Sequence, residues 1–287
     1  MKHFIIKVGI FTGLLIAILI VLKLLVSPFW GNPLIEAKVR HLNSLDIPIN
    51  TLFVGSSKTY RHIDPVLFDQ MTGLSSYNLG SSSMFYSESQ YVLQEYLKLY
   101  NQDNQVIKVF LQDRAPKEIG DQNLHSIRSK YFMNWDQWTQ GSRKFWNARA
   151  YGQVYNYTIS YAENLLCIGE VQGMITNILG LDKVVLSEFE QAHRGYYPLD
   201  LQILENPTEG ILERERLFKR QAKKRREIPE RAKMLKLVAA ETSPMDDIQF
   251  YYASHVILES EFHFDRTHLN ADGARIYTRK LANAYNN

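Results

Sequence analysis

Residues 51–57 read Thr-Leu-Phe-Val-Gly-Ser-Ser, a short apolar run that is followed directly by a glycine and two serines. Four apolar-leaning residues that end at such a cluster are typical of a buried strand feeding a loop. Asp64-Pro65 comes next and combines a helix N-cap with proline at the first helical position. The sequence therefore predicts a strand over 51–54, a loop at 55–57 and a helix over 64–72.

The same alternation of strand and helix continues along the chain. Ser76-Tyr77-Asn78-Leu79-Gly80 resembles a second short strand that ends at a glycine. Strands joined through helices pair in parallel, so this order predicts an α/β sheet. The other elements that we expect are a helix over 84–100, strands over 106–111, 234–240 and 248–258, and a last helix that begins at Asn270.

An uncharged stretch near the N-terminus predicts a membrane anchor. Residues 8–22 carry no charge, and Lys7 and Lys23 flank them. A bilayer core needs about 20 apolar helical residues, and lysines near the ends can extend to the headgroups. The alternatives are a cleaved signal peptide and a buried core helix, but residues 27–30, Ser-Pro-Phe-Trp, offer no small-x-small cleavage site.

We therefore expect a signal-anchor transmembrane helix within residues 1–30 and a polar connector over 31–50. Lys2 and Lys7 favour a cytoplasmic N-terminus, which puts the globular part outside the cytoplasm, on the periplasmic or outer face of the cell membrane. The domain that follows covers 51–287, and a mostly helical, aromatic insert occupies about 125–233.

Composition limits the class of protein. Hydrophobic residues make up 45% and charged residues 22%, which excludes a disordered chain, a collagen and a polytopic membrane protein. Cys167 is the one cysteine, so an intramolecular disulfide is impossible. The net charge of +3 gives no argument for nucleic acid as a partner.

Two features of the insert allow more than one interpretation. Residues 213–233 hold ten Lys/Arg and four Glu, a local charge of 10 − 4 = +6. This run forms either a solvated helix face or a contact with anionic headgroups or an anionic glycopolymer. The tryptophans Trp135, Trp138 and Trp146 either pack on the sheet or line a substrate-binding wall.

Two segments carry residues suited to catalysis. Ser57 follows the first strand, and ligands of open α/β sheets bind at the carboxyl ends of strands. Residues 265–270, Asp-Arg-Thr-His-Leu-Asn, precede the last helix. A serine needs a base, which His268 can supply, and Asp265 can orient and stabilise the imidazole ring.

Each of these segments also has a purely structural interpretation. Residues 55–57 can form an ordinary strand-to-helix cap, and Asp265 and His268 can close a loop. His263, Asp265 and His268 can also be drawn as a metal cluster, but the sequence places no further ligand beside them, so we expect neither a metal nor a cofactor.

Gly-x-Ser after the first strand, a glycine near residue 80 and Asp-x-x-His before the last helix resemble the SGNH (GDSL-like) hydrolases. The resemblance covers about 51–115 and 234–285 and is nearest to the membrane-anchored branch of DltD-type and alginate O-acetylation-type proteins. It implies a three-layer α/β/α, flavodoxin-like sheet carrying the helical insert.

The resemblance also implies roles for individual residues. Ser57 corresponds to the nucleophile, His268 to the base, Asp265 to the residue that orients the base, and Gly80 to a backbone donor of the oxyanion hole. The family's third block, Gly-x-Asn-Asp, is absent, because residues 110–114 read Phe-Leu-Gln-Asp-Arg. Gln112 and Asn78 are the candidate replacement donors.

The function implied is a membrane-anchored esterase or O-acyltransferase. Its substrates would be acyl esters of a cell-envelope glycan or of a lipid-linked compound. The alternative is a non-catalytic accessory protein that docks to a polytopic membrane acyltransferase during envelope polysaccharide modification.

Overall fold

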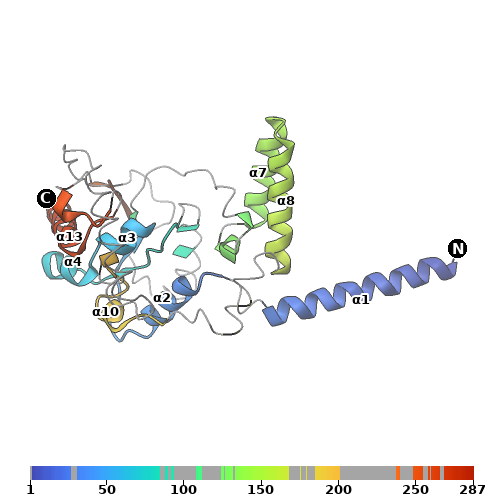
Figure 1. The fold of residues 1–287 in the computed structure, drawn as a ribbon, viewed down its shortest axis with the longest axis horizontal. Coiled ribbons are helices and arrows are strands. Elements are labelled where there is room, and N and C mark those ends of the chain that lie inside the picture. Colours follow the sequence, from blue (N-terminus) through green and yellow to red (C-terminus); the bar gives the residue numbers. More distant parts are fainter. Residues whose placement is uncertain are drawn as a thin grey trace, which may run out of the picture. The chain divides into compact units, whose positions relative to one another are not determined.

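The computed structural model describes residues 2–26, 31–84, 88–89, 92–93, 108–111, 124–125, 127–131, 133–167, 175, 179, 185–200, 237–239, 248–254, 258, 260–265 and 268–287. The chain forms two compact units, Met1–Pro33 with Glu118–Val184, and Leu34–Lys117 with Val185–Asn287. Figure 1 shows the described helices and strands along the chain.

A five-stranded sheet lies at the centre of the second unit. Its strands are β1 (Thr51–Val54), β2 (Ser76–Asn78), β3 (Lys108–Leu111), β4 (Leu237–Ala239) and β5 (Gln249–Ala253), in the order β2-β1-β3-β5-β4. The first four strands in this order pair in parallel, and β4 pairs antiparallel with β5. The predicted α/β class is confirmed.

The edge of the sheet differs from the flavodoxin-like expectation. A flavodoxin-like sheet has the order 2-1-3-4-5, whereas the described strands exchange the last two positions. The segment predicted as a strand over 234–240 supplies the antiparallel edge strand β4. Of the layered architecture that we expected, the structure shows helices that flank the described strands.

Helices α4 (Pro65–Thr72) and α13 (Ala271–Asn286) pack on one face of the sheet, and α3 (Ser57–His62) packs against α13. Phe53 of β1 lies beside Phe110 of β3, which lies beside Tyr251 of β5, so three aromatic rings form a row under these helices. The alternating residues Leu52 and Val109 are also fully buried, so both faces of the sheet are covered. Burial of both faces is typical of parallel sheets.

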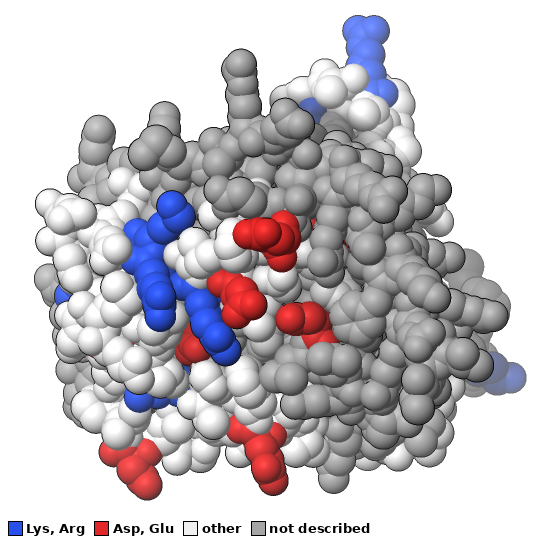
Figure 2. Space-filling model, turned by 60° about the vertical axis from the view of Figure 1, so that its left-hand side comes forward, with Lys and Arg blue, Asp and Glu red and all other residues white. Residues whose placement is uncertain are grey.

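The helix caps follow the sequence signals. Asp64 accepts hydrogen bonds from the amides of Val66 and Leu67, which confirms the N-cap predicted before Pro65. Asn270 caps α13 by accepting from the amide of Gly273. On the exposed side of α13, Arg275 pairs with Asp272 at 3.3 Å, and the face drawn in Figure 2 carries basic and acidic side chains next to each other.

The segment predicted as a polar connector contains a helix that belongs to the second unit. Helix α2 (Pro33–Asn43) buries Ile35, Ala37, Lys38 and Leu42. The sequence did not predict a buried helix here, because the segment is polar and one of the buried side chains is a lysine. The connector expected over 31–50 is therefore largely part of the folded domain.

The first unit contains α1 (Lys2–Val26) and a hairpin of two helices, α7 (Trp135–Asn147) and α8 (Tyr151–Leu166). The two helices of the hairpin lie side by side in Figure 1. Within α1, Ile6–Leu25 is long and apolar enough to span a membrane. This length and composition are compatible with a single-pass anchor.

The tryptophans of the hairpin contact other aromatic rings of the same hairpin. Trp138 stacks on Tyr161 with 5.3 Å between ring centroids, and Trp135 lies 4.8 Å from Trp138. Trp146 meets Tyr151 edge to face at 5.3 Å. The helix expected over 84–100 falls mostly outside the described residues, although 88–89 and 92–93 are described and helical, and the basic run 213–233 falls completely outside them.

Candidate active site

Ser57 lies at the carboxyl edge of the sheet. The chain leaves β1 at Val54 and turns at Gly55, whose φ of 155° is a conformation that favours glycine. Ser56 is then the N-cap of α3, and its side chain makes no capping hydrogen bond. Ser57 is the first residue of α3, so its hydroxyl stands at the start of a helix beside the end of the first strand.

A tight turn before α13 presents His268. The carbonyl oxygen of His268 accepts hydrogen bonds from the amides of Phe264 at 2.8 Å and Asp265 at 3.2 Å. The backbone amide of His268 in turn donates to Oδ1 of Asp265 at 2.9 Å. These bonds fix the ring of His268 relative to the carboxylate of Asp265.

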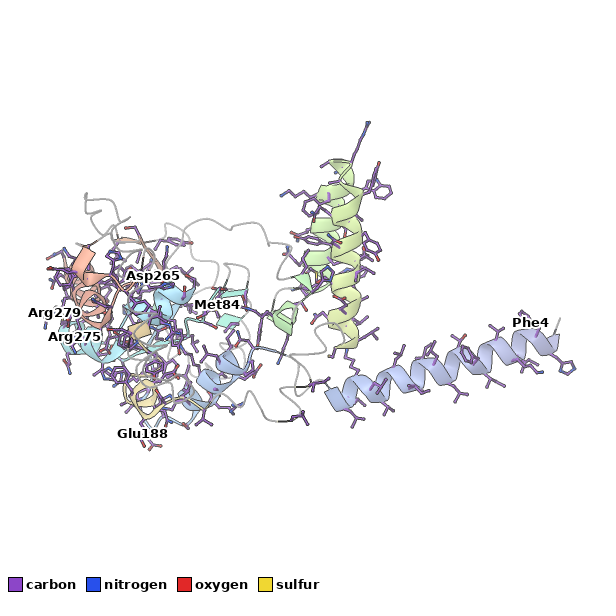
Figure 3. The ribbon with its side chains drawn as sticks, in the orientation of Figure 1. Phe4, Met84, Glu188, Asp265, Arg275 and Arg279 are labelled. Carbon is purple, nitrogen blue, oxygen red and sulfur yellow. The ribbon has the colours of Figure 1, made fainter. Side chains whose placement is uncertain are left out.

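The three side chains predicted to act together are brought together by the fold. Nε2 of His268 lies 2.9 Å from Oγ of Ser57, and Nδ1 of His268 lies 3.1 Å from both carboxylate oxygens of Asp265. The side chains of His268 and Asp265 are 20% and 16% exposed, so the group is partly shielded but reachable. Figure 3 labels Asp265 among the side chains around α3 and α13.

This geometry allows a proton to pass from the hydroxyl of Ser57 to Nε2 of His268. With Nδ1–H donating to the carboxylate of Asp265, Nε2 accepts from the hydroxyl of Ser57. A base oriented by a carboxylate in this way can take the serine proton as the oxygen attacks.

The other end of α3 holds the turn that carries His268. Nε2 of His62, the last residue of α3, accepts a hydrogen bond from the amide of Leu269 at 3.0 Å. The carbonyl of His62 accepts from Thr278 of α13 at 3.1 Å, and the rings of His62 and His268 lie 6.1 Å apart. One six-residue helix therefore positions both Ser57 and His268.

Gly80 lies where its backbone packs against α3. A Cβ atom at Gly80 would come within 2.6 Å of the amide nitrogen of Tyr60 and within 2.9 Å of Oδ1 of Asn78. The amide of Gly80 donates to this Oδ1 at 2.9 Å. The amide predicted as an oxyanion donor is thus engaged within the protein.

Asn78 holds α3 in place. Its side-chain amide donates to the carbonyls of Thr59 and Ile63, both at 2.8 Å, and its side chain is fully buried. With both N–H groups used in this way, Asn78 has a structural role in place of the expected donation to an oxyanion. Gln112, the other candidate donor, lies outside the described residues.

A buried lysine that the sequence interpretation overlooked fixes the loop after β2. The ammonium of Lys38 donates to the carbonyls of Asn78 at 3.1 Å, Gly80 at 2.6 Å and Gly195 at 2.6 Å. It also lies 3.8 Å from the centroid of the Tyr60 ring. Lys38 therefore joins α2 to the backbone of the loop that packs against α3.

A buried carboxylate compensates this lysine. Glu190 of α10 (Glu188–Ala192) accepts a hydrogen bond from the hydroxyl of Tyr60 at 2.8 Å. Burial lowers the pKa of Lys38 and raises the pKa of Glu190, and the attraction between the two charges opposes both shifts. Burial likewise lowers the pKa of Arg61, whose guanidinium donates to the carbonyl of Tyr197.

Lys38 and His62 gave no local signal in the sequence, because each makes contacts with segments far away in the chain. His263, which was considered for a metal site, accepts instead from the amide of Leu258 at 3.3 Å. Among the described residues, no group of three or more His, Cys, Asp or Glu side chains is arranged to hold a metal ion.

Comparison with models of known protein families, with curated proteins and with solved structures finds no match to this chain.

Proposed function

We propose that this chain is a membrane-anchored esterase or O-acyltransferase of the SGNH type that works through Ser57, His268 and Asp265. The observation that carries the proposal is the 2.9 Å contact between Nε2 of His268 and Oγ of Ser57, with the carboxylate of Asp265 behind the ring. A hydroxyl, a base and an orienting carboxylate in this order are the parts that acyl transfer through serine needs.

The reaction begins when Oγ of Ser57 attacks the carbonyl carbon of an acyl ester and His268 takes the hydroxyl proton. The alcohol leaves with that proton, and the acyl group remains on Ser57 as an ester. Water or a sugar hydroxyl then gives its proton to His268 and attacks the acyl carbon, and His268 returns this proton to Oγ of Ser57 as the acyl–Ser57 bond breaks. The first acceptor makes the protein an esterase and the second an acyltransferase.

The oxyanion that forms in each step needs donors. The amide of Ser57 occupies the first position of α3, where a helix offers no acceptor of its own, and it belongs to the residue whose Oγ would attack the acyl carbon. We assign it as one donor of the oxyanion hole.

The substrate class follows from the location that we propose. An anchor formed by α1 with the globular part outside the cytoplasm brings the site to acyl esters of cell-envelope glycans or of lipid-linked compounds. A partly exposed site suits a polymer or a lipid-linked chain, which a closed pocket would exclude.

One observation favours a second function, a non-catalytic accessory protein that docks to a polytopic membrane acyltransferase. The amide of Gly80 and the side chain of Asn78 are both bound within the protein. Loss of one oxyanion donor typically lowers the rate about 10²–10³-fold, and such a site would be slow.

The test compares two neighbouring serines. The purified full-length protein is assayed with p-nitrophenyl acetate as wild type, Ser57→Ala and Ser56→Ala. We expect Ser57→Ala to lose at least about a thousandfold in kcat/KM, because the covalent step is removed. Ser56→Ala should retain the wild-type rate, since its side chain makes no capping hydrogen bond. Equal rates for both variants would reject the assignment to Ser57.

A further inference from the structure

The hairpin of α7 and α8 carries a long uncharged face. On α8 the side chains at positions i, i+4, i+7, i+11 and i+14 from Tyr151 share one side of the helix and are all exposed. We call them the α8 stripe, and they are Tyr151, Tyr155, Thr158, Ala162 and Leu165. A helix of 16 residues is about 24 Å long, and the stripe follows nearly all of it.

The α8 stripe is strongly exposed for such residues. Tyr151, Tyr155 and Leu165 are 56%, 66% and 49% exposed, and Trp146 beside Tyr151 is 61% exposed. The charged residue of α8 is Glu163, which lies off the stripe and contacts His125 at 2.7 Å. Exposed aromatic side chains that adjoin one another indicate a surface that a lipid bilayer or another molecule covers.

Helix α1 belongs to the same compact unit and contacts α8. Among the described residues of α1, the two that are partly covered are Leu19 and Lys23, one helical turn apart near the end of the apolar span. Burial raises the pKa of Cys167, at the C-terminal cap of α8, and the charges of Lys23 and Lys130 oppose this rise. The C-terminal end of α8 thus lies beside the end of the span.

Basic side chains accompany the other end of α8. Arg143, Lys144 and Arg149 lie at the turn between α7 and α8 and are exposed. Aromatic residues next to lysines and arginines are the combination found on helices that lie in the membrane interface. Anionic headgroups would attract this end of the hairpin.

We infer that the α7–α8 hairpin lies along the membrane surface, with the α8 stripe in the headgroup and upper acyl region and the basic turn on anionic headgroups. The inference rests on the proposed anchoring by α1. If α1 crosses the bilayer, the C-terminal end of α8 lies at the level of the membrane surface. When α8 then runs parallel to this surface, the α8 stripe is buried in the membrane along the whole helix. The hairpin would then act as a second, interfacial attachment of the protein.

The single cysteine makes a direct test possible. Cys167→Ala removes the native thiol, and spin labels are then introduced by Tyr151→Cys, Tyr155→Cys or Ala162→Cys in the full-length chain. The protein is reconstituted into bilayers of neutral phospholipid, with and without anionic phospholipid. Leu15→Cys in α1 provides the lipid reference, and Lys280→Cys on the exposed side of α13 provides the water reference.

Collision of each label with oxygen and with a water-soluble nickel chelate reports its surroundings. We expect the stripe labels to behave like the label at position 15, with oxygen access and exclusion of the chelate, and most clearly in anionic bilayers. Stripe labels that behave like position 280 would overturn the inference. Exclusion of both reagents would also overturn it, because a second copy or another protein would then cover the stripe.

The same experiment separates this inference from the anchor on which it rests. A label at position 15 that meets the chelate as freely as one at position 280 would reject both. A lipid-embedded position 15 together with water-exposed stripe labels would reject the interfacial hairpin alone. Esterase activity does not enter either comparison.

Discussion

Oγ of Ser57 lies 2.9 Å from Nε2 of His268, although 211 positions separate the two residues in the chain. Helix α3 makes this meeting possible, because it begins with Ser57 and ends with His62, which binds the turn that carries His268. The contact between Ser57 and His268 thus depends on one short helix and on the two segments fixed to it.

The first prediction concerns the carboxylate behind the base. Asp265→Asn should lower kcat about 10³–10⁴-fold with little change in KM, because an amide no longer stabilises the charged imidazole or its productive tautomer. Steady-state kinetics with p-nitrophenyl acetate measure both constants. Asp272→Asn, on the exposed side of α13, should leave them unchanged. An Asp265→Asn enzyme as active as this control would show that Asp265 has no part in catalysis.

The second prediction concerns the positioning role of His62. His62→Phe keeps an aromatic ring beside His268 but removes the acceptor for the amide of Leu269. A displacement of the catalytic base by about 1 Å can cost about a hundredfold in rate, so kcat should fall by this order. His125→Phe, in the first unit beside Glu163 of α8, is the matched control, and it should keep the wild-type kcat.

If His62 were only a packing residue, His62→Phe would keep the wild-type kcat and lose at most thermal stability. Thermal unfolding of the same samples distinguishes this outcome from a catalytic effect. Retained kcat with a lowered Tm would therefore contradict the positioning role.

The third prediction concerns the close approach at Gly80. Gly80→Ala places a methyl group within 2.6 Å of the amide nitrogen of Tyr60, which must push the loop after β2 away from α3. We expect kcat to fall about a hundredfold, because the shift changes the geometry beside Ser57. Gly152→Ala in α8, where no atom lies within 4 Å of the added carbon, should leave kcat unchanged. Equal activity of the two variants would show that the loop does not support the site.

The fourth prediction concerns the buried ammonium of Lys38. Lys38→Met leaves three carbonyls and the buried Glu190 without their cation, which should lower the free energy of unfolding by about 3–5 kcal/mol. Lys280→Met, on the exposed side of α13, should change it by less than about 0.5 kcal/mol. Urea unfolding of the full-length protein in detergent gives these values.

The stability difference at Lys38 should depend on pH. Because burial lowers the pKa of Lys38, the unfolded state binds more protons than the native state between the folded and the unfolded pKa. The stability of the wild type relative to Lys38→Met should therefore rise as the pH approaches the unfolded pKa of about 10.4. A difference that stays constant or falls with rising pH would contradict a lowered pKa of the buried Lys38.

The sequence allowed the meeting of Ser57, His268 and Asp265 to be predicted, because its signals are local. Gly55-Ser56-Ser57 follows an apolar strand, and Asp265 and His268 share one short turn before a capped helix. Chain order and the rule that parallel strands end at one edge then bring both segments to the same place.

The supporting residues could not be predicted, because their partners lie far away in sequence. A lysine in a polar stretch is typical of a surface, yet Lys38 is fully buried by carbonyls of two distant loops. The buried side of α2 was missed for the same reason. Asn78 has the residue type of an oxyanion donor, but only its contacts with Thr59 and Ile63 show that it stabilises α3.

The most direct test of the proposed chemistry is covalent labelling of Ser57. A fluorophosphonate probe reacts with a serine hydroxyl that a base activates, and mass spectrometry of the digested protein identifies the modified residue. We predict labelling at Ser57 in the wild type and its loss in His268→Ala, whose circular dichroism should match that of the folded wild type. Absence of labelling in the folded wild type, or labelling that persists without His268, would contradict a serine activated by this histidine.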